Sequence, residues 1–164
     1  MNNLAQDLPL GKSGEDFVLQ IVQRKYPKAH RIEGNFKPYD ILVPETDTKI
    51  EVKTDRKSQE TKNVAIEVEC YGKPSGLTST EADFWAFIYW FHPKEAWYMK
   101  MVPTWKLKRD VFNDKKWFVM GGDHRASKMY LMKNFMLYNY CHDGEKNIPI
   151  SKELSELLNN GGVV

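Results

Sequence analysis

The order and spacing of the apolar segments predict an α/β domain. An apolar stripe with helical spacing comes first, and three segments with the composition or alternation of strands follow it between residues 39 and 70. The 164 residues are 41% hydrophobic and 13% aromatic, enough for a packed core, and no linker or internal repeat interrupts them. We therefore expect a single domain over residues 1–164.

The first expected element is a helix over residues 13–26. Ser13 is expected to cap its N-terminus, with Glu15 and Asp16 in the first turn, where the helix dipole favours negative charge. Pro27 helps to end this helix. Its apolar stripe consists of Phe17, Val18, Ile21 and Val22.

Three strands are expected next, in close succession. Residues 39–43 and 49–54 have the composition of strands, and the turn-rich sequence PETD joins them. Residues 63–70 alternate as a strand with two different faces does. One face carries Val64, Ile66, Val68 and Cys70, and the other carries Glu67 and Glu69, which belong either to a solvated face or to a site.

The second half of the chain begins with an aromatic run. Residues 84–91 are continuously apolar, which is typical of a buried strand, and residues 96–102 are expected to be its partner. Pro103 marks the start of a helix that ends at residue 112. The remaining expectations are a loop over 121–128, an extended segment over 129–139 and a final helix over 150–160, capped by Ser151.

The composition excludes several classes of protein. The longest apolar run has only eight residues, 84–91, whereas a membrane-spanning helix needs about 20. The N-terminus has no basic-then-apolar export signal, so we expect an intracellular, cytoplasmic protein without membrane contact. Cys70 and Cys141 stand alone rather than in C-x-x-C pairs, which fits reduced thiols better than disulfides or zinc ligands.

Positive charge is unevenly distributed along the chain. Residues 93–116 contain seven Lys or Arg against three Asp or Glu, and this stretch also holds Trp97, Tyr98 and Trp105. Basic residues interleaved with aromatic ones are typical of a nucleic-acid surface. A solvated helix face explains the same pattern equally well.

Charged residues interrupt the two strands over 39–43 and 49–54. Asp40 lies on the first, and Glu51 and Lys53 lie on the second. If the strands pair as a hairpin, the two carboxylates converge and repel each other, and a divalent cation removes that conflict. Hard carboxylate ligands suit Mg²⁺, with Mn²⁺ as a substitute.

Lys53 is expected on the same strand face as Glu51, two residues away. An ammonium there can orient a water or stabilise charge developing on a phosphate, while the metal acidifies the water. The three residues thus fit phosphodiester hydrolysis. They fit an exposed ladder of cross-strand ion pairs equally well.

The same residues resemble the core motif of the PD-(D/E)XK nuclease superfamily. Asp40, Glu51 and Lys53 match the Asp and the following Glu-x-Lys, and Glu15 matches an acidic residue of the preceding helix. Tyr39 stands where the family often has proline. The resemblance covers roughly residues 11–90 and includes phage-encoded nucleases and Holliday-junction resolvases.

This resemblance implies a fold, an activity and residue roles. The fold would be restriction-endonuclease-like, a mixed central sheet flanked by helices. Asp40, Glu51 and the Val52 carbonyl would bind Mg²⁺, Glu15 would assist the metal or its water, and Lys53 would position the nucleophile.

The implied substrate is DNA. We expect a homodimeric endonuclease that resolves four-way junctions or other branched DNA, because two sites are needed to cut two strands and no base-reading module is recognisable. The alternatives are a restriction-type or nicking endonuclease and a catalytically silent nucleic-acid-binding module. The basic segments 56–62, 93–116 and 125–128 would contact phosphates.

Overall fold

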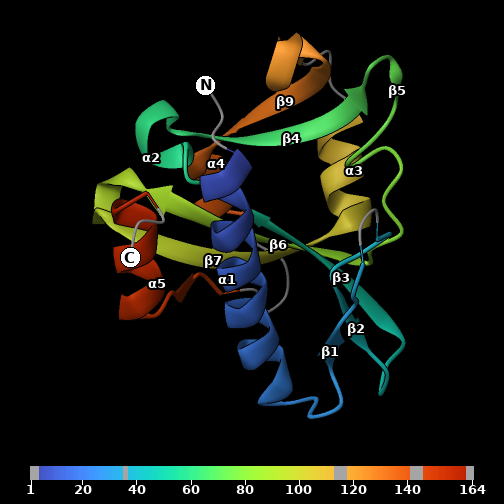
Figure 1. Cartoon of the computed structure of the whole chain (residues 1–164), viewed down its shortest axis with the longest axis vertical. Helices are drawn as coiled ribbons and strands as arrows, with labels where there is room; N and C mark the ends of the chain where they lie inside the picture. The colour runs from blue at the N-terminus through green and yellow to red at the C-terminus, as the bar shows by residue number, and fades with distance from the viewer. Residues whose placement is uncertain (1–3, 35–36, 113–117, 141–145, 162–164) are drawn as a thin grey trace.

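The computed structural model describes residues 4–34, 37–112, 118–140 and 146–161. A six-stranded mixed sheet lies at its centre (Figure 1). Strands β3 and β6 run parallel, and the other neighbouring strands are antiparallel. In spatial order the strands are β1 (His30–Arg31), β2 (Ile41–Val43), β3 (Thr48–Thr54), β6 (Phe84–Phe91), β7 (Ala96–Pro103) and β10 (Ile148–Pro149).

A second sheet of four antiparallel strands packs against the first. In Figure 1 its longest strands lie above β6 and β7. Apolar residues of β4 and β9 alternate towards the central sheet, so the two sheets share a core. In spatial order the strands are β5 (Lys73–Pro74), β4 (Asn63–Cys70), β9 (Ser127–Lys133) and β8 (Phe118–Gly121).

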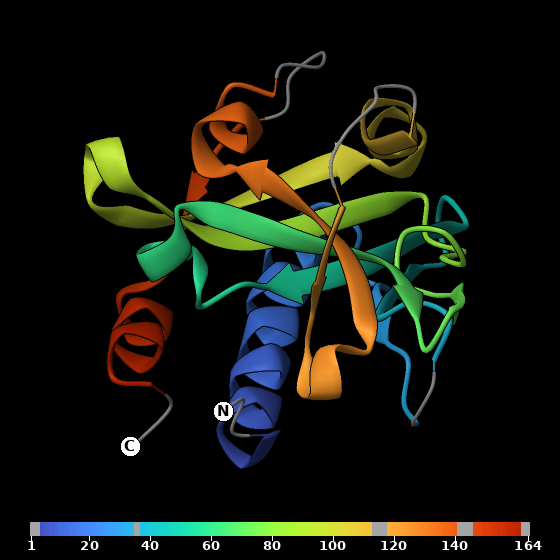
Figure 2. The ribbon, with the colours of Figure 1, turned by 90° about the horizontal axis from the view of Figure 1, so that it is seen from above.

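Helices complete both sides of the central sheet (Figures 1 and 2). Buried residues of α1 and α5 pack with β2, β3, β6 and β7 on one face. Buried residues of α3 and α4 join the second sheet on the other face. The helices are α1 (Leu4–Gln23), α2 (Ser58–Thr61), α3 (Thr104–Phe112), α4 (Asn134–Tyr138) and α5 (Lys152–Asn159), with short 3₁₀ turns η1 (His92–Lys94) and η2 (Asp123–Arg125).

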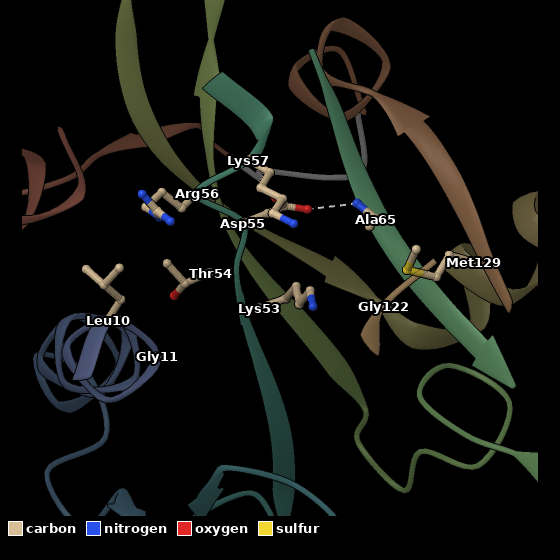
Figure 3. A pocket seen from close by; sticks show the side chains of 10 residues that line it. All are labelled: Leu10, Gly11, Lys53, Thr54, Asp55, Arg56, Lys57, Ala65, Gly122 and Met129. Atoms are coloured by element: carbon tan, nitrogen blue, oxygen red, sulfur yellow. Dashed lines mark hydrogen bonds between the residues drawn. The ribbon is translucent and has the colours of Figure 1, made fainter. Parts of the chain in front are cut away.

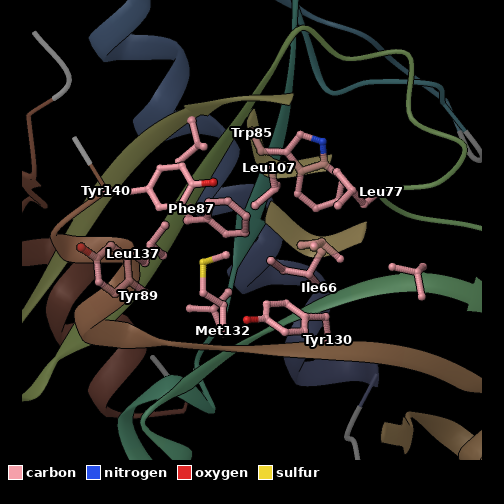
Figure 4. Packing of buried hydrophobic residues seen from close by; sticks show 14 of the residues in the cluster. Ile66, Leu77, Trp85, Phe87, Tyr89, Leu107, Tyr130, Met132, Leu137 and Tyr140 are labelled. Atoms are coloured by element: carbon pink, nitrogen blue, oxygen red, sulfur yellow. The ribbon is translucent and has the colours of Figure 1, made fainter. Parts of the chain in front are cut away.

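The core between the two sheets is rich in aromatic side chains. Figure 4 shows Phe87 of β6 among side chains of the second sheet, with Ile66 and Met132 facing it. All three are fully buried. The apolar face of β4 is thus buried in the core that the two sheets share.

The α/β class and the mixed central sheet are confirmed. The expectation that helices alone flank the central sheet is incomplete, because the second sheet also covers one face of the central sheet. The physical reason is that β4 and β9 each present a row of alternating apolar side chains, which a sheet face buries together. The strand bounds of β4 and β6 agree with the sequence prediction, and Ser151 caps α5 by accepting a hydrogen bond from the Leu154 amide at 3.2 Å.

Two predicted elements are wrong in part. Helix α1 begins at Leu4, so Ser13 lies inside it and donates its hydroxyl to the Pro9 carbonyl at 2.9 Å instead of capping. The helix extends because Leu10 is buried in the core below it. The segment 129–139 is extended only to Lys133, and α4 follows because buried Asn134 bonds the Ser58 and Trp90 carbonyls.

Two further expectations concern the thiols and membranes. Cys70 is a half-buried free thiol, and Cys141 lies outside the described residues. None of the helices in the described ranges has the length and apolar character needed to cross a membrane.

Candidate functional site

The hairpin of β2 and β3 brings two predicted site residues together. Its register pairs Ile41 with Ile50, so the next position places Asp40 opposite Glu51. The Asp40 amide donates to the Ile50 carbonyl at 2.9 Å, and its carboxylate accepts from the Val52 amide at 2.7 Å. Asp40 is 6% exposed and is therefore held in one orientation by the backbone of β3.

Glu51 is in an unfavourable environment for a carboxylate. Its neighbours across the parallel β3–β6 pair are apolar, because Glu51 pairs with Trp85 and Lys53 pairs with Phe87. Burial, and then the negative charge of Asp40, raise the pKa of Glu51 to about 8, although Lys37 and Lys53 oppose the shift. Among the described residues, the Glu51 carboxyl has no hydrogen-bond or ion-pair partner.

Glu15 reaches the same site from the middle of α1. Its carboxylate accepts from Lys37 Nζ and lies beside Arg31 Nε, each at 3.1 Å. The helix can approach β3 because residue 14 is glycine, where a Cβ atom would lie 2.0 Å from Thr54 Oγ1. The predicted first-turn position of Glu15 is wrong, so a helix-dipole role is excluded.

Lys37 is a site residue that the sequence reasoning missed. Its ammonium lies 2.9 Å from Asp40 Oδ1 and 3.1 Å from Glu15 Oε2, bridging a loop, a helix and the hairpin. Burial alone would lower the pKa of Lys37, but hydrogen bonds and charges from Asp40 and Glu15 raise it above its ordinary value. The only signal in the sequence is a basic residue three positions before Asp40.

The carboxylates meet part of the requirement for a metal. Within the described residues, no set of three or more His, Cys, Asp or Glu side chains is arranged to hold an ion. Asp40, which is buried, and Glu51, which is half-buried, nevertheless form a pair of opposed carboxylates in which Glu51 lacks sufficient positive charge. Such a pair fits Mg²⁺, which binds proteins through one or two carboxylates and keeps waters or phosphate oxygens as further ligands.

Glu67 and Glu69 have structural partners in the second sheet. The Glu67 carboxylate accepts from the Ser75 hydroxyl at 2.6 Å and from the Ser127 hydroxyl at 2.5 Å. Glu69 pairs with Lys128 at 2.9 Å across β4 and β9. Neither is among the groups that shift the pKa of Glu51, and their partners in the second sheet favour a structural role for both.

Asp55 is a second residue that the sequence reasoning missed. It follows β3 directly, is 8% exposed, and accepts from the Ser58 amide at 3.1 Å. It also accepts from the Ala65 amide at 2.8 Å, the bond drawn in Figure 3. These bonds join the end of β3 to α2 and β4. Asp55 therefore holds the backbone that carries Lys53 two residues earlier.

Comparison with known proteins assigns no family to the chain. None of the protein-family models matches it, and no curated protein matches it. What remains to indicate a function is the arrangement of Asp40, Glu51, Lys53 and Glu15 and the resemblance of their spacing to a nuclease motif.

Proposed function

We propose that the chain is a Mg²⁺-dependent DNA endonuclease that hydrolyses phosphodiester bonds. The observation that carries the proposal is the position of Asp40 opposite Glu51 on the β2–β3 hairpin, with Lys53 two residues further along the same strand face. The raised pKa of Glu51 adds support, because perturbed carboxyl groups gather at functional sites. Mn²⁺ is expected to replace Mg²⁺.

Each residue has a defined part in this proposal. Asp40, Glu51 and the Val52 carbonyl would hold the metal, which acidifies a water and offsets phosphate charge when bound. Lys53 orients the attacking water and stabilises negative charge that develops on the phosphate. Glu15 holds Lys37 and Arg31 and assists the metal or its water from α1.

The finer proposals concern fold, substrate and assembly. We assign the chain a restriction-endonuclease-like core, in which α1 precedes the β2–β3 hairpin and β6 lies parallel to β3. A homodimer supplies two sites for paired cuts in branched DNA, with four-way junctions as the preferred substrate. The protein would act on DNA in the cytoplasm.

One observation favours a different function. The Lys37 ammonium bridges Glu15 and Asp40 and so neutralises part of the acidic cluster without a metal. A nucleic-acid-binding module that has lost catalysis would have such an internal ion pair. The raised pKa of Glu51 speaks against this alternative, because Lys37 and Lys53 together leave that carboxyl under-compensated.

The test is a cleavage assay with four substrates in parallel. The purified chain is incubated with a plasmid, a linear duplex, a single strand and a fixed four-way junction, in Mg²⁺, in Mn²⁺ and in EDTA. We expect metal-dependent cutting that is fastest on the junction and absent in the Glu51→Gln variant. Cutting of the linear duplex at one sequence, as fast as the junction, would favour a restriction-type enzyme, and binding without any cutting would favour the silent module.

A further inference from the structure

The indole nitrogen of Trp85 is a buried donor without an acceptor. Trp85 lies on β6, and only 4% of its surface is exposed. Within residues 4–34, 37–112, 118–140 and 146–161, its Nε1 atom has no hydrogen-bond partner. Leaving a buried N–H group unpaired costs free energy, and most buried polar groups of folded proteins are paired. An unpaired donor in the core therefore points to an acceptor that it gains in another state of the protein.

Most neighbours of the indole cannot accept this hydrogen bond. Leu77 and Leu107 belong to the same buried cluster as Trp85, and Figure 4 draws both leucines beside the indole. The ring centroid of Phe87 is 5.8 Å from that of Trp85. On β7, the residue paired with Trp85 is Val102. Hydrocarbon side chains of this kind offer no oxygen or nitrogen as an acceptor.

The carboxyl group on the strand next to Trp85 is that of Glu51. The β3–β6 register pairs the two residues, and paired residues of neighbouring strands, which are about 4.8 Å apart, project from the same face of a sheet. Figure 4 shows the indole nitrogen on the edge of the ring that faces away from Ile66 of the second sheet. Among the described residues, the half-buried Glu51 carboxyl has no hydrogen-bond or ion-pair partner either. An unpaired donor and an unpaired acceptor thus lie on adjacent strands.

Two other carboxylates near these strands already have partners. Asp83 is exposed, and its Oδ2 atom accepts from the Lys49 amide at 2.8 Å. Asp40 accepts from a backbone amide of β3 at 2.7 Å and lies beside β2, one strand further from Trp85. Glu51 is therefore the carboxylate that combines a position beside Trp85 with a lack of donors.

We propose that the Trp85 indole N–H donates a hydrogen bond to the Glu51 carboxylate when that carboxylate binds a divalent cation, and so orients it towards the ion. Trp85 is a positioning residue, because its buried nitrogen does not reach the surface where DNA would lie. The inference rests on the metal-binding part of the proposed function and does not need cleavage. Outer groups that hydrogen-bond to a metal ligand fix its orientation, and their removal costs about 10–100-fold in metal affinity.

Trp97 provides a matched control. It is 2% exposed, lies in the same sheet on β7, and donates its Nε1 hydrogen to Asn159 Oδ1 at 2.9 Å. Trp85→Phe and Trp97→Phe each replace a buried indole by a smaller ring, so both lose similar packing. Only Trp85→Phe removes a donor beside Glu51. Replacing Trp85 by benzothienylalanine, which has sulfur in place of the N–H, removes the donor and keeps the shape of the ring.

The first measurement is Mn²⁺ binding by calorimetry, without DNA. We expect both replacements of Trp85 to weaken binding about tenfold or more, and Trp97→Phe to bind as the wild type does. Thermal unfolding checks that every variant is folded.

The second measurement is the NMR signal of the indole protons in protein that contains isotope-labelled tryptophan. The five tryptophans give five indole signals, and the signal of Trp85 is the one that is missing in Trp85→Phe. We expect Mg²⁺ to move this signal downfield, because a carboxylate acceptor deshields the proton, and to leave that of Trp97 in place.

The outcomes separate this inference from the proposed function. Equal Mn²⁺ affinities of Trp85→Phe and Trp97→Phe would overturn the positioning role. Wild-type affinity in the benzothienylalanine protein, or a Trp85 signal that Mg²⁺ does not move downfield, would overturn it as well. A wild-type chain that binds neither ion would refute the proposed function and this inference together. Metal binding that depends on the Trp85 N–H, in a chain that cuts no DNA, would support the inference and refute the nuclease.

Discussion

Glu51 on β3 and Glu67 on β4 occupy similar positions in the sequence and very different positions in the structure. Each lies between two apolar or small residues of a strand. Glu67 accepts from two serine hydroxyls, whereas Glu51 has apolar rings beside it and Asp40 opposite it. Burial and the charge of Asp40 raise the pKa of Glu51 to about 8.

This difference shows how a structural carboxylate is distinguished from a candidate functional one. A buried carboxylate with two donors contributes to stability and specificity of packing. A carboxylate placed against another carboxylate costs free energy, and such an arrangement persists where a ligand compensates it. Removing charges separately in the two regions tests this distinction.

The largest expected effect comes from removing the two carboxylates separately. Glu51→Gln removes a metal ligand, so cleavage in Mg²⁺ should fall on the order of 10³-fold, while the free energy of unfolding rises or is unchanged. Glu67→Gln should leave cleavage unchanged and cost about 1–3 kcal/mol, because a hydroxyl loses its acceptor. Single-turnover cleavage and thermal unfolding measure both. Equal losses of cleavage rate in the two variants would contradict the assignment of Glu51 to the site and of Glu67 to the structure.

Lys53 and Lys128 form the second pair, since each lies beside a strand glutamate. Lys53→Met should reduce the single-turnover rate about 10²–10³-fold and affect DNA affinity far less, because Lys53 acts on the transition state. Lys128→Met removes the partly exposed ion pair with Glu69, worth about 1 kcal/mol or less, and the contact of the ammonium with the Phe118 ring. A Lys53→Met enzyme with a normal rate and weak binding would move Lys53 from catalysis to DNA binding.

Lys37 tests whether an internal cation competes with the metal. Lys37→Met leaves Glu15 and Asp40 without their shared ammonium, so the affinity for Mn²⁺ measured by calorimetry should increase about tenfold. The metal-free variant should melt at lower temperature than the wild type. Lys28→Met is the control, because Lys28 is exposed and changes the net charge equally. Unchanged Mn²⁺ affinity would show that Lys37 does not oppose the metal.

The last expected effect, which needs no metal or DNA, is a pH dependence of stability. The pKa of Glu51 is about 8 in the folded protein against 4.5 ordinarily, so the folded state retains a proton that the unfolded chain has lost. Raising the pH from about 5 to 8 without metal should therefore lower stability, by at most about 1.4 kcal/mol per pH unit. Above pH 8 the carboxyl is ionised in the folded and the unfolded state alike, so Glu51 causes no further change of stability with pH.

Urea unfolding at several pH values measures that slope. The slope should disappear in Glu51→Gln and remain in Glu67→Gln. Stabilisation by Mg²⁺ should grow over the same interval, because the metal binds the ionised carboxylate. An identical slope in wild type and Glu51→Gln would assign the titration to another group.

Local patterns in the sequence predicted most strands and part of the site. The alternation of residues 63–70 and the aromatic run over 84–91 depend on neighbouring residues, so both strands were found with correct bounds. The convergence of Asp40 and Glu51 followed from a short hairpin, in which the turn sets the register. Partners that are distant in the sequence were not predictable, because local patterns carry no information about them. The hydrogen bond between Ser127 and Glu67, for example, joins residues 60 positions apart.

The sequence by itself determined the α/β class, the hairpin and the alternation that places Glu51 and Lys53 on one face, since these depend on propensity and on a two-residue period. Only the tertiary structure decided the second sheet, the start of α1 at Leu4 and the approach of Lys37 to Asp40 and Glu15. Burial is a property of the whole chain. Burial and the charge of Asp40 together raise the pKa of Glu51 to about 8, and neither can be read from the residues next to it in the sequence.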